Sequence, residues 1–191
     1  MARLLLGGGK RQAVTSARGF TLVELLIVVA VIGILASIAV ISLARARQSG
    51  NEASAIGSMR AVVSGEAAYA SSCGGGGYAQ SNADLAKAPV GSPAFISPDL
   101  EKADLAANAK SGYIVDVNDS ADPDNRDVSA AADTCNGAAG AARAKYHVSA
   151  DPLSRGVTGQ RSFGSDRNGT IYFSTTAAIP NPIPGGLDFI Q

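Results

Sequence analysis

The chain has no tryptophan, one histidine and two cysteines, and aromatic residues make up 5% of its 191 residues. So few aromatic side chains provide no stacking platform for single-stranded nucleic acid. Two cysteines and one histidine are also a poor ligand set for structural zinc. No nucleophile-elbow or phosphate-loop motif occurs, so the sequence carries no enzyme signature.

Charge is scarce and unevenly distributed. The first 19 residues contain four basic residues and no acidic one, whereas the rest of the chain has 12 basic against 16 acidic residues. An acidic folded part argues against nucleic acid as a partner, because neutralising phosphates needs a basic face. The basic N-terminus predicts a cytoplasmic leader under the positive-inside rule.

Proline is missing before Pro89, and charge is missing between Glu24 and Arg45. The twenty uncharged residues 25–44 would span about 30 Å as a helix, which matches a bilayer core. Apolar residues at steps of three and four then continue to the glycines of 74–77, which predicts an amphipathic continuation of the same helix. We expect four segments: a cleaved basic leader (1–19), a transmembrane helix (20–44), its amphipathic half (45–73) and a globular α/β domain with an extended tail (74–191).

Strand patterns follow the glycine run. The segments are 113–117, 144–148, 161–163 and 170–173. The Asn168-Gly169 pair between the last two is a hairpin signal. Three or four antiparallel strands packed on a long N-terminal helix predict an α+β fold.

The segments between and after the strands lack such patterns. Short helical turns are expected within 82–87 and 98–107, a surface loop at 118–143 and an extended tail at 176–191. The single histidine, His147, is expected to be an exposed or edge residue of its strand rather than a catalyst.

Both cysteines, Cys73 and Cys135, lie beyond the apolar run. If that part of the chain is outside the cytoplasm, a disulfide between them is expected. It would close a loop of roughly 60 residues and contribute on the order of 4 kcal/mol in the chain-entropy model.

A carboxylate at the edge of a membrane-length apolar run is costly and needs an explanation. Glu24 could begin an ordinary secretory signal, with Ala44-Arg45-Ala46 as a weak cleavage site, or it could be incidental to a plain membrane anchor. The apolar run is too long for a signal peptide, however.

The residues Arg18-Gly19-Phe20-Thr21-Leu22-Val23-Glu24-Leu25 resemble the cleavage motif of type IV pilins and type II secretion pseudopilins. The resemblance implies a pilin-like fold and cleavage by prepilin peptidase between Gly19 and Phe20, followed by N-methylation of Phe20. It also implies an assembly role for Glu24, whose charge would be compensated by the Phe20 amine of a neighbouring subunit. Gly33 and Ser37 have the small-xxx-small spacing that permits close helix packing. The proline that many members carry near the end of the membrane segment is absent here, where Ile41 follows Val40.

These features predict a structural subunit rather than an enzyme. Its expected partners are prepilin peptidase, other copies of itself, other pilins or pseudopilins and an inner-membrane assembly platform. The precursor would be a single-pass inner-membrane protein with a periplasmic C-terminal domain, which then enters a surface pilus for adhesion or motility or a periplasmic secretion pseudopilus. A membrane-tethered domain that never polymerises is the alternative from another class.

No cofactor is expected, with one qualification. Residues 119–127 include four carboxylates, and carboxylate oxygens suit calcium. They are Asp119, Asp122, Asp124 and Asp127. The EF-hand pattern fails because no glycine lies where its sharp turn requires one, so a solvated acidic loop is the competing interpretation.

Overall fold

A computed structural model describes residues 19–190, and leader residues 1–18 lie outside the described part. The chain divides into two compact units, Met1–Ile41 and Ser42–Gln191. This division falls three residues before the boundary drawn from charge at residue 44. One helix, α1 (Leu22–Ser72), contributes to both units.

The second unit is the globular part. After α1 it contains one short α-helix, three 3-10 turns and six strands. They are α2 (Asn82–Ala86), η1 (Pro98–Leu100), η2 (Ala106–Asn108), β1 (Tyr113–Asp119), β2 (Asp127–Ser129), η3 (Ala131–Asp133), β3 (Ala142–Arg143), β4 (Tyr146–Pro152), β5 (Ser162–Asp166) and β6 (Tyr172–Ser174).

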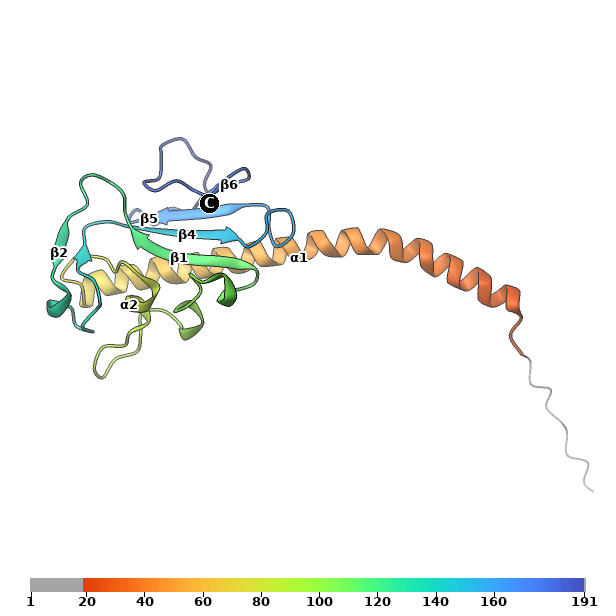
Figure 1. Cartoon of the computed structure of the whole chain (residues 1–191), viewed down its shortest axis with the longest axis horizontal. Helices are drawn as coiled ribbons and strands as arrows, with labels where there is room; N and C mark the ends of the chain where they lie inside the picture. Colours follow the sequence, from red (N-terminus) through yellow and green to blue (C-terminus); the bar gives the residue numbers. More distant parts are fainter. Residues whose placement is uncertain (1–18, 191) are drawn as a thin grey trace, which may run out of the picture. The chain divides into compact units, whose positions relative to one another are not determined.

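Four strands form an antiparallel sheet in the order β1-β4-β5-β6, as predicted. Figure 1 shows β1, β4 and β5 running alongside the second half of α1. Alternate residues of β1 are buried, and they meet a stripe of α1 side chains in one apolar core. The core includes Met59, Val62 and Tyr69 of α1, Tyr113, Val115 and Val117 of β1, Val148 of β4 and Phe163 of β5. The fold is therefore the α+β, pilin-like arrangement expected from the sequence.

The glycine run ends α1, as its composition indicated. The amides of Gly74 and Gly76 donate to the carbonyls of Tyr69 and Ala70, which satisfies acceptors at the helix C-terminus. Gly75 and Gly76 have φ values of +61° and +93°, which other residues rarely adopt.

β1 is the outermost strand of the sheet, and a buried asparagine of α2 covers its free edge. Asn82 Nδ2 donates to the carbonyls of Leu100 and Val115, both at 2.8 Å, and its Oδ1 accepts from the amide of Val117 at 2.8 Å. Because one side chain replaces a neighbouring strand, this part of the edge offers no free ladder groups to another chain.

Three predictions are wrong. The expected loop 118–143 contains the β2–β3 ribbon and η3. The expected extended tail instead turns back, so that the amide of Phe173 donates to Asp188 and that of Ile190 donates to Ile171. His147 is buried rather than exposed. Its strand, β4, is interior to the sheet, and its imidazole bonds to the backbone of Pro180 in the C-terminal tail.

Candidate functional site: the N-terminal assembly segment

The N-terminus of α1 is closed by a reciprocal cap between Thr21 and Glu24. Thr21 Oγ1 accepts from the Glu24 amide at 3.1 Å, while Glu24 Oε2 accepts from the Thr21 amide at 2.9 Å and from Thr21 Oγ1 at 2.7 Å. This is a capping box, in which two otherwise unpaired helix N–H groups are satisfied. The Thr-x-x-Glu spacing of residues 21–24 is the sequence signal for this cap, which was not among the predictions.

The cap changes the interpretation of Glu24. A carboxylate beside a helix N-terminus is stabilised by the helix dipole and by hydrogen bonds to its own chain. Its contacts with Thr21 use Oε2, and Oε1 contacts no donor in residues 19–190. The group is therefore partly compensated in the single chain, and one oxygen is left for another partner.

The peptide bond between Gly19 and Phe20 precedes the helix, which begins at Leu22. The Phe20 side chain is 88% exposed. Apart from the neighbouring residues, no atom of residues 19–190 lies within 4 Å of the position that a Cβ on Gly19 would occupy. This bond therefore lies outside α1, next to an exposed side chain.

The apolar half of α1 is exposed in the part of the chain that the structure describes. From Phe20 to Leu43 its large apolar side chains are all exposed. Within residues 19–190, α1 is the one helix long and apolar enough to cross a membrane. Such a continuous apolar surface needs lipid or other protein around it.

The two predicted packing residues are placed without strain on this helix. A Cβ added at Gly33 would meet nothing within 4 Å, and the Ser37 hydroxyl donates to the Ile34 carbonyl at 2.7 Å. Because the hydroxyl is satisfied within the helix, Ser37 can face lipid or a neighbouring helix at low cost. Within residues 19–190 neither residue is seen to contact another element, so their packing role remains a prediction. The helix is continuous through Ile41, the position at which many type IV pilins carry proline.

Beyond the apolar half, the exposed face of α1 is lined by small residues. They are Ala46, Gly50, Ala53, Gly57, Ala61, Ser64 and Ala68. Arg60 is the one exposed charged residue of α1 between Gln48 and Ser72. A solvated helix face normally carries more charge than this, so the small-residue face resembles a contact surface.

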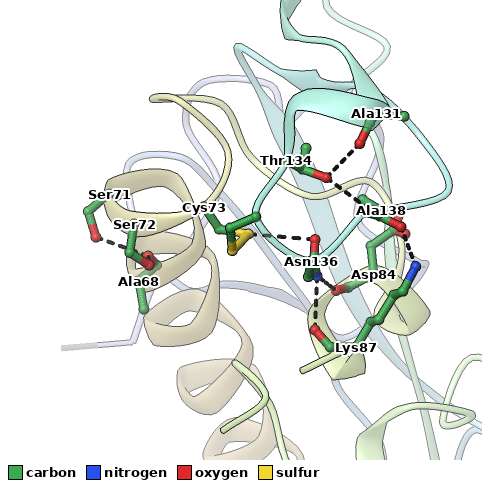
Figure 2. Close-up of a disulfide and its surroundings, with 12 residues drawn as sticks. Ala68, Ser71, Ser72, Cys73, Asp84, Lys87, Ala131, Thr134, Asn136 and Ala138 are labelled. Carbon is green, nitrogen blue, oxygen red and sulfur yellow. Dashed lines mark hydrogen bonds between the residues drawn. A yellow bond between two sulfur atoms is a disulfide. The ribbon is translucent and has the colours of Figure 1, made fainter. Parts of the chain in front are cut away.

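The predicted disulfide partners are bonded to each other, joining the end of α1 to the loop before β3. Figure 2 shows the next residue, Asn136, pointing toward α2, where its Nδ2 donates to the carbonyls of Asp84 and Lys87 at 2.8 and 2.9 Å. Cys73 is buried and Cys135 is exposed. The bond therefore fastens a loop that α2 also holds.

The acidic stretch pairs with two cations, Arg143 of β3 and Lys145 just before β4. Asp119 and Asp127 contact Arg143, and Asp122 lies 2.6 Å from Lys145 Nζ. In residues 19–190 no three histidine, cysteine or carboxylate side chains converge as a metal site would require. The calcium hypothesis is tested by thermal unfolding with and without a chelator, and an unchanged melting temperature would end it.

Comparison with known families identifies the N-terminal segment. Residues 15–40 match the model of the prokaryotic N-terminal methylation motif, which covers the exposed Gly19–Phe20 bond, the cap and the first part of the apolar helix. No curated protein and no solved structure matches the chain.

Proposed function

From the N-terminal methylation motif at residues 15–40, the hallmark of the type IV pilin and pseudopilin family, we propose that this chain is the precursor of a filament subunit. Prepilin peptidase cuts between Gly19 and Phe20, the new amine of Phe20 is methylated, and subunits then polymerise through α1. The observation that carries the proposal is an accessible Gly19–Phe20 bond directly before a capped, membrane-length apolar helix.

Glu24 has two tasks in this proposal. In the single chain it completes the capping box of α1. In the filament its free Oε1 accepts the charged Phe20 amine of a neighbouring subunit, and the pair is stabilised by the low dielectric around packed apolar helices. Assembly thus adds a second partner to a carboxylate whose charge is already partly compensated within its own chain.

The small-residue face of α1 supports helix packing beyond the membrane segment. The exposed Gly50 and Gly57 leave open space where a side chain would otherwise be. Small residues let two helix backbones approach closely, as at membrane helix interfaces. In this proposal neighbouring copies of α1 lie against this face in the filament core.

The precursor is anchored in the inner membrane by residues 25–44, with its leader in the cytoplasm and its globular unit in the periplasm. Its partners are prepilin peptidase, further pilin subunits and an assembly platform in the same membrane. A surface pilus is our leading assignment, and a periplasmic type II secretion pseudopilus is the alternative within the family.

The test compares two substitutions at Glu24. Glu24→Gln keeps an acceptor for the capping box but removes the charge, whereas Glu24→Ala removes both. We expect both variants to insert in the membrane and both to lose filaments. Filaments are sought in the fraction sheared from the cell surface and, with the protein overexpressed, in the periplasmic fraction. Normal filaments with Glu24→Gln would refute charge compensation as the driving term.

Crosslinking separates the filament from a monomeric tether. Single cysteines placed along residues 25–44 should yield a ladder of oligomers on oxidation. Monomers alone at every position would favour the non-polymerising tether.

A further inference from the structure

The loop between β4 and β5, residues 153–161, displays an apolar side chain on a tightly bonded turn. The amides of Val157 and Thr158 both donate to the Ser154 carbonyl, at 3.0 and 2.9 Å, and the Gly156 amide donates to Gly159 at 2.8 Å. Val157 is nevertheless 69% exposed, and Leu153 near the loop's start is also exposed. One exposed valine is ordinary in itself, so its meaning depends on where the loop is held.

The loop is held against α1 just past the uncharged run. Gln48 Nε2 donates to the Gly156 carbonyl at 2.5 Å, and Asn51 Nδ2 donates to Thr158 at 2.8 Å. Gln48 comes four residues after Ala44, the last uncharged residue of the run, which is about 6 Å along a helix. The headgroup layer on each side of a bilayer is about 5–7 Å thick. The loop is therefore attached to α1 at headgroup level if the uncharged run fills the hydrocarbon core.

The charges at this level are basic. Arg45 and Arg47 are the first charged residues after the run, both are exposed, and neither makes an ion pair within residues 19–190. The nearby Glu52 is already neutralised, because its Oε2 lies 2.8 Å from Arg161 Nε. Arg155 adds a further positive charge while its guanidinium braces the loop on Gln160. An anionic lipid surface complements this arrangement.

We propose that the β4–β5 loop docks on the outer surface of the inner membrane, with Val157 in the interfacial layer and Arg45 and Arg47 on the phosphates of anionic phospholipids. The inference rests on the proposed function, since it requires residues 25–44 to span the bilayer. The contact holds the precursor at a fixed depth, and it must break when the subunit leaves the membrane for a filament.

The test uses the full chain in nanodiscs that contain one copy each, with phosphatidylglycerol mixed into phosphatidylcholine. A nitroxide is attached at Val157→Cys, and its collisions with oxygen and with a water-soluble nickel complex are compared. Val90→Cys is the matched control, because Val90 is likewise an exposed valine on a loop. That loop lies beside Ala68 and Ser72, about 36 Å further along α1 than Ala44. A third label at Ile34→Cys reports on the membrane span, and intact mass confirms that the native disulfide is kept.

We expect the Val157 label to be protected from nickel and open to oxygen while the Val90 label is open to nickel. Omitting phosphatidylglycerol, or combining Arg45→Gln with Arg47→Gln, should reduce the ratio of docked to undocked loop. The expected reduction is about fivefold for each arginine, which corresponds to the roughly 1 kcal/mol that a basic residue gains near an anionic surface.

Three results would overturn the proposal. Equal nickel access at Val157 and Val90, with Ile34 still protected, refutes the docked loop and leaves the membrane span standing. Nickel access at Ile34 refutes the span and the docking together. Protection of Val157 that appears only when a nanodisc holds two copies identifies a second subunit, not lipid, as the partner.

Discussion

Replacing the buried Glu66 should change how the stability of the globular unit depends on pH. Glu66 lies on the core face of α1 with 0% exposure, where Oε2 accepts from the Ala79 amide at 2.9 Å and Oε1 has no partner. Burial raises the pKa of this carboxyl well above its usual value, and the charge of Asp84 raises it further. The protonated form is therefore the one that the folded state favours.

The sign of the effect follows from proton linkage. A group whose pKa is higher in the folded state makes unfolding release protons, so the free energy of unfolding falls as pH rises between the unfolded and folded pKa values. The unfolded value is near 4.5, so the decline begins there. Its slope approaches about 1.4 kcal/mol per pH unit for one proton. Glu66→Gln imitates the neutral acid and should remove this slope.

The assay is urea unfolding of the full chain in detergent micelles at several pH values between 5 and 8. We expect the wild type and Glu66→Gln to have similar stability near pH 5, and the variant to be more stable at pH 8. Glu52→Gln is the matched control on the same helix. Burial alone would raise the pKa of Glu52, but hydrogen bonds from Gln160 and Arg161 lower it overall, so this variant should keep the wild-type slope above pH 5. Identical slopes for the wild type and Glu66→Gln would refute the reasoning.

Two further predictions concern the same unit. Replacing Cys73 and Cys135 together by serine should lower the free energy of unfolding by about 4 kcal/mol in the chain-entropy model, and unchanged urea midpoints would contradict it. Gly65→Ala should destabilise the fold, because its Cβ would meet the Phe95 carbonyl oxygen at 2.7 Å, whereas Gly57→Ala has open space and should stabilise α1 by up to about 1 kcal/mol. Thermal unfolding of both alanine variants checks the second prediction, which fails if they shift the melting temperature equally.

The sequence predicted the elements whose signals are local. The lack of proline and the three-and-four spacing predicted one helix to residue 73, and it ends at Ser72. The Asn168-Gly169 turn was also predictable, because Gly169 has a φ of +75° and joins the antiparallel β5 and β6.

The missed features depend on contacts between distant segments. Nothing near His147 indicates that β4 is an interior strand or that Pro180 of the tail will contact its side chain, and nothing in the tail indicates that residues 188–190 return to β6. The same holds for Asn82, which replaces a strand partner of β1. Local polarity alone therefore predicted exposure where tertiary pairing produces burial.

Within the N-terminal segment, the apolar run and the cleavage motif were readable, whereas the role of Thr21 was not recognised. Its cap means that Glu24 is not an unpaired charge awaiting assembly. In the filament that we propose, assembly is therefore driven by one further contact at Oε1 together with helix packing. The gain from that contact is smaller than the full cost of burying a bare carboxylate.

N-terminal mass spectrometry of the mature protein from its native membrane tests the central claim most directly. We predict a chain that begins at Phe20 and carries one extra methyl group on its amine. A chain that keeps the leader, or one cut after Ala46 so that the apolar helix is lost, would contradict the proposal of a processed filament subunit.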